Sequence, residues 1–246
     1  MASDTVIWTF LPGLDGTAQL SDGIKEVLPS ETHAEFIELP SSGKQDYDSL
    51  TDWLDKKIAH GKKRLLIAES FSGPLVLRWA EQRPHEVVGI VLVTSFCDAP
   101  LNPGIALLPL RPLFMVKTPR HTLRHFLIGE DASEAEVSQV SSVVQAIPSA
   151  TLTKRVRAIL ELIENDSPVL DQVPMMILQA QSDNLIPWEA QRKLEACYPN
   201  ARTHWIESPH LMLYRFPEQC IQRIAEFASE LGQGQKKDGS ISSPPH

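Results

Sequence analysis

The chain has few cysteines, no long apolar run and no excess of positive charge. Its cysteines, Cys97, Cys197 and Cys220, are odd in number, widely spaced and without a C-x-x-C pair, so they predict neither a disulfide framework nor a zinc site. No apolar stretch approaches the roughly 18 to 20 residues that a membrane-spanning helix needs. Lysine and arginine total 23 against 31 aspartates and glutamates, and this net charge of −8 argues against a nucleic acid or an anionic membrane as a partner.

The composition is that of an ordinary globular protein. Hydrophobic residues make up 42% and charged residues 22% of the 246 residues, a length that suits one large α/β domain. The opening segment MASDTVIWTF leads into a strand pattern without the basic segment and apolar core of a secretion signal. We therefore expect a cytoplasmic protein.

Strand and helix patterns alternate along most of the chain. Apolar runs predict strands at 5–11, 34–39, 64–69, 87–95, 174–181 and 202–207. Amphipathic spacing predicts helices near 18–28, 47–60, 73–83, 188–198 and 217–231. Such alternation predicts a mainly parallel sheet of about six strands with helices on both faces. The polar, glycine- and serine-rich tail at 232–246 is expected to be disordered, which leaves one domain at 1–231.

One segment, residues 98–170, interrupts the alternation. It begins with an apolar stretch broken by prolines and continues through two or three helical patterns. In one of them Val156, Ile159, Leu160 and Ile163 recur at intervals of three and four residues, as on the apolar face of a helix. We interpret this segment as an insertion within the domain.

The most informative motif is LLIAESFSGPLVL, in which an apolar run ends at Ser70 and a helical pattern begins at once. A serine at the apex of so sharp a turn presents its hydroxyl above the edge of the sheet. The residues two positions before and after it must be small, and here they are Ala68 and Ser72, followed by Gly73. This pattern makes Ser70 a candidate nucleophile.

Two further motifs place polar residues just past predicted strands. MMILQAQSDNLIP places Asp183 there, and ARTHWIESPHLMLYRFPE places His210 in the loop before the last helix. A serine attacks a carbonyl only when an imidazole takes its proton, and the imidazole needs a carboxylate to fix its tautomer. Asp98 also follows a strand and could replace or assist Asp183, although its position is that of an ordinary turn residue.

Taken together, these motifs resemble the α/β-hydrolase family. That family has a nucleophile elbow, usually written G-x-S-x-G, and its nucleophile, acid and base follow in the order Ser, Asp, His. Here the next smallest residues, Ala68 and Ser72, replace both elbow glycines. The resemblance implies an α/β-hydrolase fold with the catalytic triad Ser70, Asp183 and His210 at the carboxyl ends of the strands.

The turn PGLDGT at residues 12–17 is similar to the segment that follows the third strand in this family. There, the residue after the first glycine and the residue after the nucleophile donate backbone N–H groups to the oxyanion. The resemblance assigns these two roles to Leu14 and Phe71. Gly13 and Gly16 are also compatible with an ordinary turn that has no catalytic task.

The resemblance also implies what the chain lacks and what the insertion does. The two leading antiparallel strands of many family members are missing, and the segment 98–170 is a small helical cap that roofs the active site. Apolar side chains near its start would line a substrate pocket; the candidates are Leu107, Leu108, Leu110, Phe114 and Met115. Any one of them could instead pack the cap onto the sheet.

These features predict a serine hydrolase that cleaves a carboxylic ester or thioester with an apolar acyl or alcohol group through an acyl-enzyme intermediate. Its partner would be a small-molecule substrate. No cofactor or metal is implied, because His121 and His125 have helical spacing but lack the glutamate of an H-E-x-x-H motif. The alternatives are a non-catalytic small-molecule-binding or receptor protein on the same fold, and a carbon–carbon bond hydrolase or lyase with the same triad.

Overall fold

Six parallel strands form one sheet at the centre of the structure, a computed structural model that describes residues 5–100, 117–163 and 167–238. The strands are β1 (Ile7–Leu11), β2 (His33–Phe36), β3 (Arg64–Glu69), β4 (Val87–Val93), β5 (Met175–Ala180) and β6 (Arg202–Ile206). Their order is β2-β1-β3-β4-β5-β6, so β2 and β6 form the two edges. Every neighbouring pair is parallel. The α/β fold expected from the sequence is confirmed.

The central strands are buried on both faces of the sheet. All seven residues of β4 are buried, and Leu65, Leu66 and Ile67 of β3 have no exposed surface. A parallel sheet that is covered on both sides requires such continuous apolar runs. For this reason the sequence predicts the bounds of β3 without error.

One face of the sheet packs against three helices, α2 (Tyr47–Lys57), α3 (Ser72–Gln82) and α8 (Trp188–Cys197). Leucines from each helix fill the layer between them and the strands, and none has any exposed surface: Leu50, Leu54, Leu75 and Leu194. A 3-10 turn, η1 (Pro84–Glu86), connects α3 to β4.

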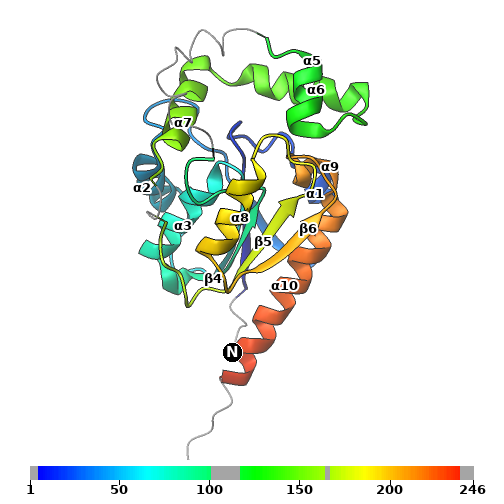
Figure 1. The fold of residues 1–246 in the computed structure, drawn as a ribbon. Coiled ribbons are helices and arrows are strands. Elements are labelled where there is room, and N and C mark those ends of the chain that lie inside the picture. Colours follow the sequence, from blue (N-terminus) through cyan, green and yellow to red (C-terminus); the bar gives the residue numbers. More distant parts are fainter. Residues whose placement is uncertain (1–4, 101–116, 164–166, 239–246) are drawn as a thin grey trace, which may run out of the picture.

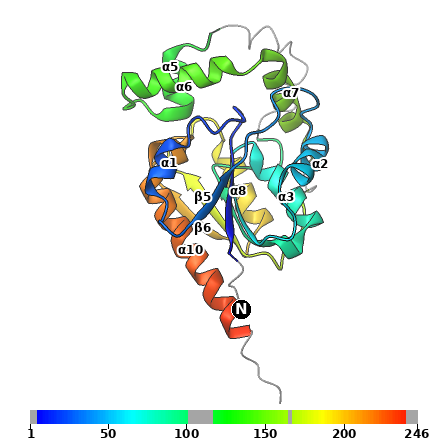
Figure 2. The ribbon, with the colours of Figure 1, turned by 180° about the vertical axis from the view of Figure 1, so that it is seen from behind.

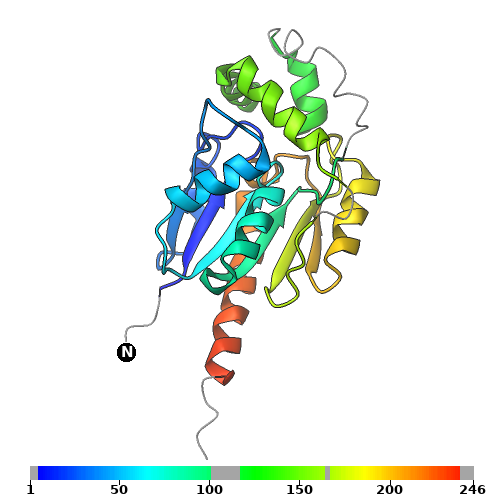
Figure 3. The ribbon, with the colours of Figure 1, turned by 90° about the vertical axis from the view of Figure 1, so that its left-hand side faces the viewer.

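The opposite face packs against α1 (Asp22–Val27) and α10 (Pro217–Asp238), with the short helix α9 (Met212–Arg215) beside them. Their contacts with the sheet are apolar and include Ile24, Ile221, Ile224 and Phe227. Figure 3 shows α2 and α3 on the near side of the sheet and α10, in orange to red, on the far side. Although α10 is long, no helix in the described ranges combines the length and apolarity needed to cross a membrane.

The described helices of the insertion lie beyond the carboxyl ends of the strands (Figures 1 and 2). They are α5 (Arg120–Leu123), a π-helical turn η3 (Arg124–Ile128), α6 (Glu134–Ala146) and α7 (Ser149–Leu160). A capping box of Ser133 and Glu136 begins α6. A small apolar cluster joins this region to the loop after β6; it contains Leu123, Ile128, Val137, Val140 and Leu211.

Several helix boundaries differ from those expected. The first helix begins at Asp22 instead of near residue 18, and α2 ends at Lys57 instead of near residue 60. The last helix continues to Asp238 instead of ending near residue 231, although its final residues include two glycines. In the insertion, α7 ends at Leu160, and Ile163 is 69% exposed. The apolar spacing through Ile163 was misleading, since the buried face of α7 carries polar residues, Arg155 among them.

Candidate active site

Ser70 lies in the turn between β3 and α3 with a backbone φ of 48°. Apart from glycines, Ser70 and Thr94 are the residues with positive φ in the described part of the chain, a conformation that strains L-residues. Backbone hydrogen bonds hold the turn: the Ser70 N–H donates to the Val93 carbonyl at 2.8 Å, and the Gly73 N–H donates to the Ser70 carbonyl at 3.0 Å. The turn therefore has the strained geometry that its motif predicts.

The residues around Ser70 are small because other segments crowd them. Ala68 has no exposed surface, and the Ser72 hydroxyl donates to a carbonyl of the turn at residues 12–17. A methyl group at Gly73 would overlap the hydroxyl of Ser95, which donates a 2.8 Å hydrogen bond to the Ser70 carbonyl. Alanine and serine suffice at the positions where the family usually has glycine, whereas Gly73 itself has no room for a side chain.

Ser70, His210 and Asp183 form a continuous hydrogen-bonded chain. His210 Nε2 lies 3.1 Å from Ser70 Oγ, and His210 Nδ1 lies 2.8 Å from Asp183 Oδ2. The side chains of His210 and Asp183 are 3% and 1% exposed. In this arrangement the imidazole is able to take the serine proton while the carboxylate fixes its tautomer. The structure thus brings together the three residues that the motifs singled out.

The loop after β5 holds the carboxylate of Asp183 in place. Its Oδ1 accepts hydrogen bonds from the N–H groups of Leu185 and Ile186 at 2.8 and 2.9 Å, which leaves Oδ2 for the histidine. Asp98, the alternative acid, forms an ion pair with Lys193 of α8 instead. The carboxylate that faces the imidazole is therefore that of Asp183.

The turn at residues 12–17 packs against the candidate nucleophile. A methyl group at Gly13 would lie 3.8 Å from Cβ of Ser70. The backbone N–H groups of Leu14 and Phe71 donate no hydrogen bond to any residue that the structure describes. Within the described residues, both amides therefore remain available to a ligand, as an oxyanion hole requires.

Arg155 of α7 contacts both Leu14 and Phe71, although no sequence motif marks it. It is 1% exposed, its guanidinium donates to the Leu14 carbonyl at 2.7 Å, and its Cζ lies 5.7 Å from the centre of the Phe71 ring. Tyr47 also holds Phe71, because its ring stacks on it at 5.1 Å and its hydroxyl donates to the Phe71 carbonyl at 3.0 Å. Since Arg155 and Leu14 are 141 positions apart, only the fold reveals this contact.

The charge of Arg155 is buried among neutral acceptors. Its Nε donates to Gln45 Oε1 at 2.9 Å, and its Nη2 donates to the Pro40 carbonyl at 3.1 Å. Burial lowers the pKa of the guanidinium to about 10, against the opposing effect of the Asp15 carboxylate, so the group stays charged at neutral pH. Gly16, with φ of 73°, lies directly against the guanidinium, and any side chain there would overlap it.

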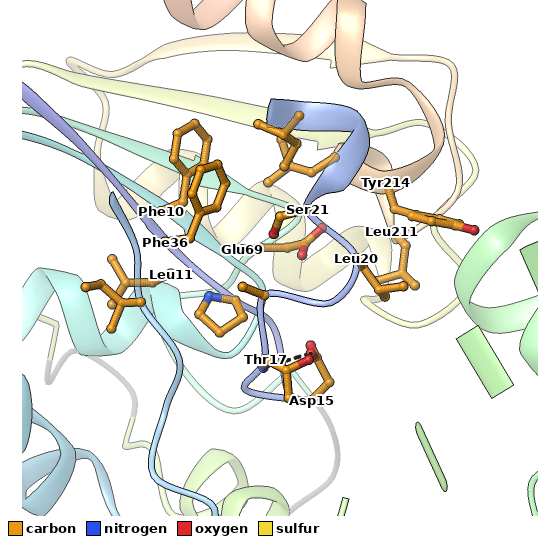
Figure 4. A pocket seen from close by; sticks show the side chains of 15 residues that line it. Phe10, Leu11, Asp15, Thr17, Leu20, Ser21, Phe36, Glu69, Leu211 and Tyr214 are labelled. Atoms are coloured by element: carbon orange, nitrogen blue, oxygen red, sulfur yellow. Dashed lines mark hydrogen bonds between the residues drawn. The ribbon is translucent and has the colours of Figure 1, made fainter. Parts of the chain in front are cut away.

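Glu69, the residue before Ser70, is a partly buried acid that the sequence interpretation did not single out. Its side chain reaches into a hollow of about 30 Å³ that Leu20 and Tyr214 also line (Figure 4). Its Oε1 is buried and has no hydrogen-bond partner among the described residues. Burial raises the pKa of Glu69 to about 7, an effect that His210 opposes and Asp15 reinforces. Burial raises the pKa of Asp15 as well.

The predicted substrate-pocket residues do not belong to the described part of the chain. The pocket candidates Leu107, Leu108, Leu110, Phe114 and Met115 lie outside the described residues. Within the described ranges, no group of three or more His, Cys, Asp or Glu side chains could hold a metal ion.

Comparison with known protein families assigns the chain to one of them. The family described as serine aminopeptidase, S33, matches residues 33–212, well over half of the sequence. The chain belongs to this α/β-hydrolase family. The matched range contains Ser70, Asp183 and His210 and begins after the turn at 12–17. No curated protein sequence matches this S33-family chain.

Solved structures with the same fold include several hydrolases. A thermophilic esterase from Thermogutta terrifontis superimposes with a TM-score of 0.77 at 16% identity, over 92% of this chain and 90% of its own. A carboxylesterase structure from Nitrososphaera gargenis gives 0.76 at 14% identity, over 94% and 92%. An enol-lactonase from Burkholderia xenovorans gives 0.73 at 14% identity, over 92% of each chain. At these identities the likeness establishes the fold alone.

Proposed function

We propose that this S33-family protein is a serine hydrolase that cleaves a carboxylic ester or thioester through an acyl-enzyme intermediate. The observation that carries the proposal is the hydrogen-bonded chain from Asp183 through His210 to Ser70, with links of 2.8 and 3.1 Å. The strained backbone of Ser70 and the free amides of Leu14 and Phe71 beside it support the same chemistry.

In the first half of the reaction, Ser70 Oγ attacks the carbonyl carbon and its proton passes to Nε2 of His210. The amides of Leu14 and Phe71 donate to the carbonyl oxygen as it becomes negative. When the tetrahedral intermediate collapses, His210 protonates the departing alcohol or thiol, and the acyl group stays on Ser70. In the second half, His210 activates a water molecule that releases the acid. Asp183 holds the imidazole in the required tautomer throughout.

The bond that is cleaved is proposed from the structural neighbours. An esterase and a carboxylesterase share the fold over more than nine-tenths of this chain, which favours an ester. The family description, serine aminopeptidase, names a different substrate class, the amide of an N-terminal amino acid. We favour an ester or thioester with an apolar acyl or alcohol group, because the insertion begins with a run of leucines, prolines, Phe114 and Met115.

Labelling with a fluorophosphonate probe tests this proposal, because the probe reacts only with an activated serine. The probe should attach to a peptide that contains Ser70, and Ser70→Ala should abolish both labelling and ester turnover. Ser208→Ala is the matched control, since Ser208 is 2% exposed and close in sequence to His210 but has no assigned role. It should keep both properties.

The outcomes separate the alternatives. Labelling that persists in Ser70→Ala would disprove the assignment of the nucleophile. Labelling at Ser70 with turnover of aminoacyl p-nitroanilides but not of esters would move the substrate to the aminopeptidase class. Labelling at Ser70 without turnover of either class would favour a carbon–carbon bond hydrolase or lyase. No labelling and no turnover would favour a non-catalytic binding protein.

A further inference from the structure

Two of the three cysteines lie side by side in the fold. Cys97 and Cys197 are 100 positions apart in the sequence, yet their Sγ atoms are 2.8 Å apart. Neither forms a disulfide, and the distance between their sulfurs exceeds the S–S bond length of a disulfide by only about 0.8 Å. Widely spaced cysteines gave no sign of this pair in the sequence.

The pair lies at the base of the insertion. Cys97 follows β4, immediately before the insertion begins at residue 98, and Cys197 is the last residue of α8. The segment that returns from the insertion is hydrogen-bonded close to both cysteines. The Ser167 hydroxyl donates to the Cys97 carbonyl at 2.7 Å, and the Tyr198 hydroxyl, next to Cys197, donates to the Pro168 carbonyl at 3.1 Å. A bond between the two sulfurs would join α8 to the start of the insertion, next to the hydrogen bonds that hold its returning end.

Solvent reaches the two sulfur atoms unequally. Cys97 is 4% exposed and lines a hollow of only about 10 Å³. Cys197 is partly exposed and lines a cavity of about 370 Å³, formed mainly by residues 167–175 and 198–201. A small reagent in solution therefore meets Cys197 first.

The surroundings of Cys97 favour its protonated form in the reduced pair. The hydrogen bond with Cys197 raises the pKa of the Cys97 thiol, and burial raises it further. Lys193, paired with Asp98, opposes this shift with its positive charge. The more exposed Cys197 is therefore the residue that we expect to react first.

We propose that Cys97 and Cys197 form a thiol–disulfide exchange site that a small-molecule disulfide oxidises. The Cys197 thiolate attacks one sulfur of the reagent, so that a mixed disulfide forms and one thiolate leaves. In the mixed disulfide Cys97 no longer has a thiol partner at Cys197; it releases its proton to solvent and attacks the Cys197 sulfur as a thiolate, so that the bond between Cys97 and Cys197 forms and the second thiolate of the reagent leaves. The two cysteines lose two electrons and two protons in all, and the two departing thiolates take up protons from solvent to become thiols.

This site is separate from the proposed catalytic residues and does not depend on the proposed function. Cys220 provides a matched comparison inside the same chain. Its thiol is also buried, with no exposed surface, and it donates toward the Met212 carbonyl at 3.8 Å. Because no hydrogen bond or disulfide joins it to another cysteine among the described residues, it should not take part in exchange.

The experiment treats the folded full chain with oxidised glutathione, removes the oxidant, blocks the remaining thiols with N-ethylmaleimide in denaturant so that buried thiols are reached, and maps the peptides by mass spectrometry. We expect one disulfide between the peptides of Cys97 and Cys197 and a single blocked thiol, that of Cys220. Dithiothreitol should restore all three thiols. Cys97→Ala should stop at one glutathione adduct on Cys197, and Cys220→Ala should form the same disulfide as the unsubstituted chain.

Three results would overturn the proposal. One is the survival of all three thiols in the folded chain at oxidant concentrations that oxidise a dithiol peptide control. Another is a stable glutathione adduct on Cys197 in the unsubstituted chain, as in Cys97→Ala, because it would mean that Cys97 does not resolve the mixed disulfide. The third is reaction of Cys220 at the same rate as Cys197.

Discussion

The guanidinium of Arg155 donates a 2.7 Å hydrogen bond to the carbonyl of Leu14, the residue whose own N–H is proposed to bind the oxyanion. Arg155 belongs to α7 in the insertion, whereas Leu14 belongs to the turn after β1. One buried side chain thus connects the insertion to the proposed oxyanion hole, and it also contacts the Phe71 ring.

We predict that Arg155→Lys lowers kcat about 10- to 100-fold with little change in KM, because lysine cannot reproduce three directed hydrogen bonds and the Leu14 amide loses its fixed position. Steady-state kinetics on an ester measures this effect. Arg64→Lys is the control, since Arg64 is also fully buried but pairs with Glu35 and Thr9 at the start of β3. It should lower the melting temperature and leave kcat unchanged. A rise in KM alone for Arg155→Lys would contradict the positioning role.

We predict that Asp183→Asn lowers kcat by about 10³ to 10⁴, the magnitude known for the equivalent change in a serine protease, because the amide stabilises the wrong imidazole tautomer. Kinetics on the same ester measures the loss. Asp98→Asn, which removes the partner of Lys193, should keep most of the activity. A large loss in Asp98→Asn with a small loss in Asp183→Asn would assign the acid role to Asp98.

We predict that Glu69 makes the fold less stable as the pH rises. Its pKa is about 7 in the folded chain against 4.5 in the unfolded chain, so between these values the folded state holds a proton that the unfolded state has lost. The free energy of unfolding should therefore fall across this range, by about 1 to 3 kcal/mol.

Urea unfolding of Glu69→Gln tests this prediction. Glutamine keeps the shape of the protonated acid and cannot ionise, so the variant should gain stability relative to the unsubstituted chain between pH 4.5 and pH 8. A difference in the free energy of unfolding that does not change with pH would show that Glu69 does not titrate there.

We predict that Gly73→Ala severely lowers stability or activity, since the added methyl group would overlap the Ser95 hydroxyl beside the Ser70 turn. The double variant Gly73→Ala with Ser95→Gly should recover part of the loss, because it removes the overlapping atoms. Melting temperature and fluorophosphonate labelling measure both effects. Equal behaviour of Gly73→Ala and the unsubstituted chain would mean that the turn is not crowded.

We predict a preference for short to medium aliphatic or aryl esters. Each methylene that enters an apolar pocket contributes up to about 0.8 kcal/mol, enough for a severalfold gain in kcat/KM per carbon until the pocket is full. A series of p-nitrophenyl esters should therefore rise from acetate to a maximum and then fall. A flat series would mean that the insertion forms no acyl pocket.

The sequence predicts those parts of the molecule in which neighbouring residues determine the structure. Continuous apolar runs predict the strands. Ser70, Asp183 and His210 each follow such a run, so they lie together at the carboxyl ends of the parallel strands. Contacts over long sequence separations are different, because no local pattern encodes them. Arg155 and the Cys97–Cys197 pair were missed for this reason. Glu69 was missed although its position next to the nucleophile was a usable signal.

The unpaired side of β2 bears on how the protein avoids aggregation. Exposed strand edges are templates for pairing with other chains, and proteins limit this risk with short strands and charged side chains. In the described part of the chain, no strand pairs with the outer side of β2. It is four residues long, and Glu35 in its middle is anchored to Arg64 at 2.6 Å. The buried Arg64 thus holds a charged carboxylate on this edge strand, where the charge disfavours pairing with a strand of another chain.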